Sequence, residues 1–164
     1  MSRLVSVRKY LCFLVFLSTV AFASTDGTLY LVGSIPTRFD LRIDPVIGQQ
    51  DTLNIAGGES GLKVADVAEI SNFINGYEIF VESVNGGSLT HNNGLSAVTY
   101  QIQYGLTGPN VSPPVLGSPL SVKTSGALTG LTFNFEEVFI SFTGDATLPA
   151  GAYTDTLVIS MQAL

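Results

Sequence analysis

The sequence predicts an all-β fold, either a sandwich or a barrel of antiparallel strands. Apolar and polar residues alternate with a period of two in many short segments, and no window shows a sustained helical period. Glycine, asparagine and proline separate these segments at short intervals, as in chains that reverse direction repeatedly. The clearest segments are 38–44 and 98–104, each with one apolar and one polar face. These two should therefore be strands with one solvated face.

Seven further segments are expected to be strands on weaker alternation: 51–56, 62–71, 76–83, 88–91, 131–137, 138–143 and 154–164. A change of phase within 62–70 predicts a β-bulge, and a second change across Glu136 and Glu137 predicts either a bulge or a passage between sheets. The Asn-Gly pair within 84–87 predicts a hairpin turn, and the proline-rich stretch 105–118 predicts one long loop.

The segment that ends at Leu164 follows a turn that Pro149 and Gly151 favour. Its apolar side chains recur at every second position, which is the spacing of a half-buried strand. The residues expected on its inner face are Leu157, Ile159, Met161 and Ala163.

The first 23 residues predict a secretory signal peptide. Basic residues precede a short apolar run at 11–17, and Ala21 and Ala23 provide the small side chains that a signal peptidase reads. A retained anchor is disfavoured because the apolar stretch is shorter than the roughly 20 residues that a membrane-spanning helix needs. We therefore expect an exported protein whose mature part, residues 24–164, forms a single domain with no membrane partner after cleavage.

Composition excludes several classes of function. Outside the signal peptide, four basic residues face thirteen acids, which leaves a formal charge of −9 and disfavours nucleic acid or an anionic membrane as a partner. The only cysteine, Cys12, lies within the signal peptide, so the mature chain can form neither a disulfide nor a thiolate metal site. Packing and strand pairing must stabilise the domain.

No catalytic constellation is visible, and we expect neither an enzyme nor a cofactor or metal site. The only histidine, His91, lies in a turn-like stretch with no second histidine or cysteine to complete a site. We expect it to be exposed and replaceable by alanine at a cost within about 0.5 kcal/mol. Glu136 and Glu137 are adjacent in an expected strand, so their carboxylates point to opposite faces and fit the edge or a bulge of a sheet better than a catalytic pair.

Several segments, taken together with the exported start, resemble the subunits of chaperone–usher pili and related spore-coat-U-like secreted domains. They are the alternating stretch 28–35 ahead of Pro36, the middle stretch 69–83, and the turn and strand entry at 148–157. The resemblance implies an immunoglobulin-like Greek-key β-sandwich that lacks one strand and is completed by donor-strand exchange. It also implies a structural role in cell adhesion, with the protein passing from the periplasm to the cell surface or fimbrium, or to the extracellular space.

The resemblance further implies which residues meet a partner. Within the extension 24–36, the face donated to another copy or a related subunit would carry Leu29, Leu31, Gly33 and Ile35. The accepting strand would present Leu157, Ile159 and Met161, and a periplasmic chaperone would clamp the carboxylate of Leu164 before an usher assembles the subunit. The stretch 29–35 equally fits a first strand that completes its own sandwich, so action in cis and action in trans both remain open.

A second class of function is a monomeric secreted ligand-binding module. In that interpretation the loops around His91 and at 105–118 would contact a carbohydrate or a protein, with Tyr100 and Tyr104 nearby. Self-association of the mature protein would distinguish a structural subunit from such a module.

Overall fold

A computed structural model describes residues 30–49 and 52–164, which form strands and loops without any helix. The predicted all-β fold is therefore confirmed. The predicted signal peptide and Leu29 lie outside the described residues. The strands are β1 (Phe39–Pro45), β2 (Gly58–Ser71), β3 (Tyr77–Ser83), β4 (Ser88–His91), β5 (Ala97–Thr99), β6 (Gln101–Tyr104), β7 (Asn110–Val111), β8 (Leu120–Thr124), β9 (Thr132–Thr143), β10 (Tyr153–Thr154) and β11 (Leu157–Ala163).

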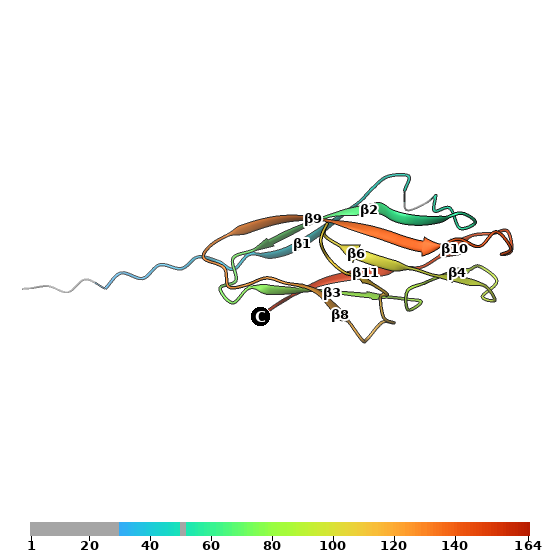
Figure 1. Ribbon diagram of the computed structural model, residues 1–164. Helices are drawn as coiled ribbons and strands as arrows, with labels where there is room; N and C mark the ends of the chain where they lie inside the picture. The colour runs from blue at the N-terminus through green and yellow to red at the C-terminus, as the bar shows by residue number, and fades with distance from the viewer. Residues whose placement is uncertain (1–29, 50–51) are drawn as a thin grey trace, which may run out of the picture. The chain divides into compact units, whose positions relative to one another are not determined.

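The chain divides into two units, Met1–Ser34 and Ile35–Leu164. All the described strands belong to the second unit, where they form two facing layers (Figure 1). One layer is a five-stranded sheet in the order β1-β2-β9-β6-β7. The other layer consists of two three-stranded sheets, β11-β3-β8 and β10-β4-β5, and every strand pair in the three sheets is antiparallel.

The core lies between the layers and follows the alternation of the strands. On β3 every second residue is buried, and Tyr77, Ile79 and Val81 have no exposed surface. Tyr77 and Ile79 belong to the same core cluster as Val67 of β2 and Val138 of β9, which are also fully buried. Each such aliphatic side chain contributes about 1.5–3 kcal/mol by leaving water, so this cluster holds the two layers together.

The bulge expected within 62–70 is confirmed, whereas the phase change across Glu136 and Glu137 has another cause. The register of β2 against β9 shifts between Glu59 and Leu62 and again between Lys63 and Ala65. In contrast, β9 is one strand without a register break from Val138 to Thr132. Its inner face changes from polar to apolar along its length, so the expected division at this point is wrong.

Other expected boundaries also need correction. The segment 98–104 is two strands, because the chain leaves the β4 sheet at Tyr100 and continues in the β9 sheet as β6. Residues 52–56 form no strand. The turn at 84–87 does contain two glycines with positive φ, Gly86 and Gly87, but it joins β3 to β4, which are not paired with each other. It is therefore not a hairpin.

Two of the described strands, β7 and β8, were not predicted from the sequence. The short β7 lies inside the expected loop, and β8 follows it. Alternation in β8 runs over only five residues, yet it completes the sheet beside β3 and brings Lys123 toward the interior. A pattern of this length is too short to separate a strand from a loop by periodicity alone.

Candidate functional site

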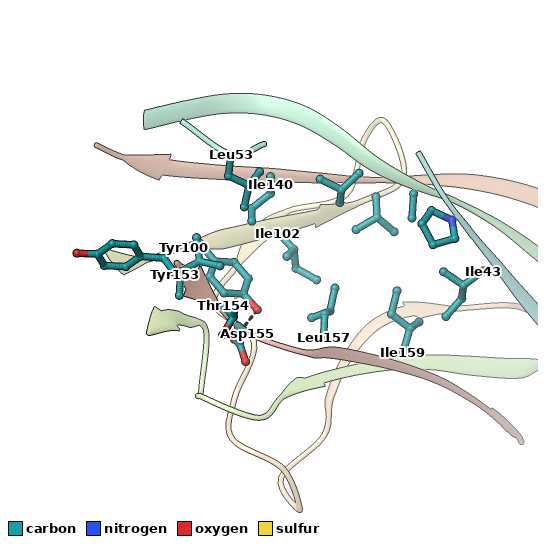
Figure 2. Close-up of a pocket in the computed structure, with 15 residues that line it drawn as sticks. Ile43, Leu53, Tyr100, Ile102, Ile140, Tyr153, Thr154, Asp155, Leu157 and Ile159 are labelled. Atoms are coloured by element: carbon teal, nitrogen blue, oxygen red, sulfur yellow. Dashed lines mark hydrogen bonds between the residues drawn. The ribbon is translucent and has the colours of Figure 1, made fainter. Parts of the chain in front are cut away.

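An apolar groove of about 440 Å³ opens between the free edges of β1 and β11. Figure 2 shows side chains from both layers pointing into it, including Ile43 of β1 and Leu157 and Ile159 of β11. Its deeper wall comes from strands of the core. The residues that complete this wall are Val64, Ala65, Leu89, Ile102, Val138 and Ile140.

The groove exists because two edge strands turn apolar side chains inward without a neighbouring strand to cover them. Ile43 pairs with the buried Val67 and so faces the interior, yet it remains 39% exposed. On β11, Leu157, Ile159 and Met161 face the interior beside β3 but are only half-buried. The expected inner face of this strand is thus confirmed through Met161, whereas Ala163 is exposed. A further strand in the groove would bury these side chains.

Both edges also present backbone groups. Among the described strands, β1 pairs only with β2 and β11 pairs only with β3, so each offers one unpaired row of N–H and C=O groups. Unpaired sheet edges are templates for the addition of another strand. The groove therefore combines an apolar floor with hydrogen-bonding edges.

One end of the groove is polar. The Tyr100 hydroxyl donates a 2.8 Å hydrogen bond to Asp155 Oδ2, and Asp155 Oδ1 accepts bonds from the backbone N–H groups of Asn85 and Thr156. Burial and the bond to Asp155 raise the pKa of Tyr100 above its usual range, so its hydroxyl stays protonated and keeps donating. This pair closes the groove where β10 leads into β11.

The expected donor residues lie in a segment without strand structure over its described part. Leu31 is 81% exposed and Ile35 is 87% exposed, while Gly33 lies between them. Of the expected accepting residues, Leu157 and Ile159 line the groove itself, whereas Met161 does not. Leu164 is half-exposed, and its N–H donates to the carbonyl oxygen of Gly76.

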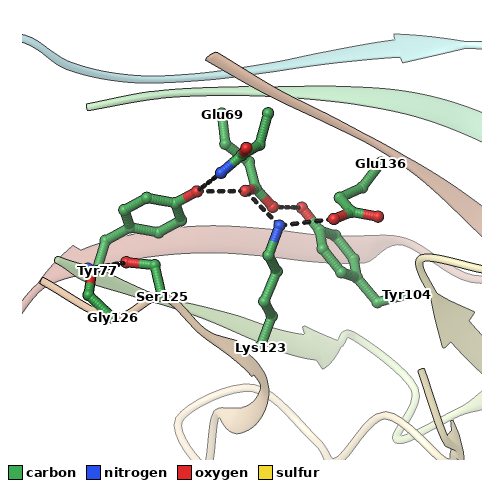
Figure 3. Close-up of polar contacts among 8 residues, drawn as sticks. Glu69, Tyr77, Tyr104, Lys123, Ser125, Gly126 and Glu136 are labelled. Atoms are coloured by element: carbon green, nitrogen blue, oxygen red, sulfur yellow. Dashed lines mark hydrogen bonds and ion pairs between the residues drawn. The ribbon is translucent and has the colours of Figure 1, made fainter. Parts of the chain in front are cut away.

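A cluster of polar side chains around Glu69 lies inside the sandwich and was not predicted from the sequence. The Glu69 carboxylate, 1% exposed as a residue, accepts 2.6 Å bonds from the hydroxyls of Tyr77 and Tyr104 and a 2.7 Å bond from Lys123 Nζ (Figure 3). Lys123 also binds Glu136 Oε1 at 2.7 Å. Glu136 is therefore an inward residue of β9. Glu136 and Glu137 lie beyond the part of β9 that pairs with β6, residues 138–141, so only β2 pairs with the strand there, as expected for sheet-edge residues, and no bulge occurs at these positions. Glu137 instead pairs with Lys63 at 2.7 Å.

The surroundings of this cluster keep its two tyrosines and its lysine protonated. Burial and the bonds to Glu69 raise the pKa values of Tyr77 and Tyr104, so both hydroxyls remain protonated. Burial alone would lower the pKa of Lys123, but its bonds to Glu136 and Glu69 outweigh that effect and raise it. The cluster joins strands of both layers through satisfied polar groups, so we interpret it as a structural clasp.

His91 is buried, so the prediction of an exposed side chain is wrong. It is 7% exposed, its Nδ1 accepts a 3.1 Å bond from the N–H of Asn93, and its Nε2 lies 3.3 Å from the carbonyl oxygen of Ala150. These partners assign the hydrogen to Nε2, which donates to Ala150. Its ring also packs 4.8 Å from that of Tyr153, and a Cβ on Gly151 would collide with it. The side chain thus fixes the loop before β10.

Replacing His91 with alanine should lower the free energy of unfolding by about 1–3 kcal/mol, because it removes a buried side chain together with its two hydrogen bonds and its packing on Tyr153. This value replaces the smaller effect expected for an exposed side chain. The measurement is urea unfolding, with Asn92→Ala as the exposed neighbouring control, expected within about 0.5 kcal/mol of the parent. Equal stabilities of the two variants would contradict the structural role of His91.

Tyr100 and Tyr104, expected beside a ligand-binding surface, are both buried with their hydroxyls bonded to carboxylates. The described residues contain no group of three or more histidine, cysteine or carboxylate side chains arranged to hold a metal ion. Within 30–49 and 52–164, no helix has the length and apolarity that a membrane crossing requires. No family model and no curated protein matches the chain.

Proposed function

We propose that the protein is an exported, non-enzymatic structural subunit of a surface or fimbrial assembly, joined to its neighbours by β-strand complementation. The observation that carries this proposal is the apolar groove between the free edges of β1 and β11. In this proposal the two layers are an immunoglobulin-like Greek-key sandwich that accepts its missing strand from another molecule. A periplasmic chaperone would cover the same groove before an usher assembles the subunit.

Strand addition suits this groove on physical grounds. An extended segment would pair its backbone with β1 or β11, and every second side chain would enter the apolar floor. It would cover Ile43, Leu157 and Ile159, which are only partly buried. Hydrogen bonds along the edges and burial of apolar surface would act together, as in other cases of β-augmentation.

The proposed occupant is the segment 24–35 of a second copy. Leu29, Leu31 and Ile35 recur at even spacing, and the two of them that the structure describes are exposed. Twelve extended residues span about 40 Å, whereas the seven residues of β1 span about 23 Å. The segment is therefore long enough to cover the whole length of the β1 edge.

Removing residues 24–35 tests the proposal. The mature chain 24–164 should self-associate with rising concentration, whereas 36–164 should be monomeric and less stable, because its groove has no strand to fill it. A synthetic peptide of residues 24–35 should raise the melting temperature of 36–164 in proportion to the logarithm of its concentration. Analytical ultracentrifugation and thermal melts measure both effects.

A peptide in which Leu29 and Leu31 are both aspartate is the matched control and should not stabilise 36–164, because the groove floor is apolar. The proposal is wrong if 24–164 stays monomeric at all concentrations and the parent peptide leaves 36–164 unchanged.

A further inference from the structure

We infer that Asn72 acts as a positioning residue that opposes a turn at residues 36–38, so that the N-terminal segment is supplied to a second copy rather than to the groove of its own chain. This inference rests on the proposed function, because it concerns which molecule supplies the strand. Its basis is a set of three hydrogen bonds that hold the chain just before β1.

Asn72 follows the last residue of β2 and binds the chain ahead of β1 with both its backbone and its side chain. Its N–H donates to the carbonyl oxygen of Arg38 at 3.1 Å. Its Oδ1 accepts from the N–H of Arg38 at 2.7 Å, and its Nδ2 donates to the carbonyl oxygen of Pro36 at 3.0 Å. The side chain thus extends the β1–β2 pairing beyond Phe39, the first residue of β1.

These bonds lie on the edge of β1 that faces β2, whereas the groove lies along the opposite edge. Residues 35–38 show no turn, and together with Asn72 they border a surface hollow that also includes Ile74, Leu128 and Leu131. Proline fixes its own φ and restricts Ile35 before it to an extended conformation. The chain therefore makes no turn at residues 35–38, where it would have to reverse to enter its own groove.

The N-terminal segment could enter the groove of its own chain only if it ran antiparallel to β1. A segment parallel to β1 would place Ile35 near Pro45, about 23 Å from Phe39, while residues 36–38 bridge at most about 14 Å. A segment antiparallel to β1 would require a hairpin turn at residues 36–38, and Leu31 would then lie opposite Ile43. That turn would break the side-chain bonds of Asn72. A second copy needs no such turn.

Disulfide trapping distinguishes the two routes, because the mature chain contains no cysteine. The double variant Leu31→Cys/Ile43→Cys should yield mainly disulfides between chains on oxidation, resolved by non-reducing gel electrophoresis. Adding Asn72→Ala should raise the ratio of disulfides within a chain to those between chains about tenfold, as expected for the loss of two hydrogen bonds. Asn72→Asp retains the acceptor for Arg38 and should give a smaller rise.

The matched control is Asn75→Ala, an exposed asparagine that makes none of these bonds, and it should leave the ratio unchanged. An unchanged ratio in both Asn72 variants, with disulfides between chains still abundant, would overturn the role of Asn72 and leave strand exchange intact. Disulfides mainly within the chain in the parent variant would overturn the inference as well. If the parent double variant forms no disulfide of either kind and remains monomeric, the proposed function itself is wrong.

Discussion

Replacing Lys123 with methionine should lower the free energy of unfolding by about 3–5 kcal/mol. The substitution removes the cation that binds Glu69 and Glu136, and the Glu69 side chain has no exposed surface. A buried carboxylate without its cation keeps the cost of desolvation and loses the attraction that offsets it. Urea unfolding of the two proteins at neutral pH measures this difference.

Lys63→Met is the matched control, because Lys63 also binds two carboxylates at 2.7 Å, those of Asp66 and Glu137. Those partners are partly exposed, so solvent screens the pairs and the loss of Lys63 should cost far less stability than the loss of Lys123. Adding Glu69→Gln to Lys123→Met should restore part of the stability, because a neutral amide oxygen can still accept from the tyrosines. Equal losses of stability in Lys123→Met and Lys63→Met would contradict the structural role of the buried cluster around Glu69.

The same clasp gives the wild type a characteristic response to alkali. The pKa values of Lys123, Tyr77 and Tyr104 are all raised in the folded protein above ordinary values of 10.5 for lysine and 10.0 for tyrosine. The folded chain therefore binds more protons than the unfolded chain above about pH 10, and stability falls as the pH rises. Lys123→Met should weaken this dependence by removing one of the three groups.

Replacing Leu31 with aspartate should abolish self-association of the mature protein while leaving the domain folded. In the proposed assembly Leu31 enters the apolar groove of a second copy, where an unpaired charge costs several kcal/mol. In the separate chain Leu31 is 81% exposed, so the melting temperature of the monomer should barely change. Sedimentation velocity and thermal melts on the same samples test both statements.

Val32→Asp is the control for charge, since Val32 is similarly exposed and adjacent residues of a strand point to opposite sides. It should retain association, because its side chain would face away from the groove. If Leu31→Asp still associates like the parent, Leu31 does not enter a groove. If it unfolds the monomer, the segment serves its own domain.

Most strands could be predicted from local pattern, since a period of two in apolar residues needs only neighbouring positions in the sequence. The wrong predictions occur where the position of a side chain depends on partners that are far away in the sequence. In β9 the inner positions carry Asn134 and Glu136, while Phe135 points outward and is 78% exposed. The apolar side chains of this stretch therefore lie on the outer face of β9. Its inner face is polar because it packs against Lys123 and Glu69 in the interior.

The buried His91 was unpredictable for a similar reason. Its partners Ala150 and Tyr153 lie about sixty residues away and meet it only because β10 pairs with β4. Glu69 carried a weak signal, as a charged residue between Val67 and Ser71 on the inner face of an alternating segment. A charge at such a position predicts a buried partner, but the sequence could not name Lys123, which lies on a strand that was not foreseen.

The sequence by itself determined the all-β class, most of the strands and the inner face of β11, because side-chain alternation and turn chemistry act over a few neighbouring residues. The tertiary structure alone decided which edges remain free, where a groove forms between β1 and β11, and how Asn72 holds the chain before β1. These features depend on the order of strands within the sheets. That order is set by contacts between residues far apart in the chain, which no local pattern records.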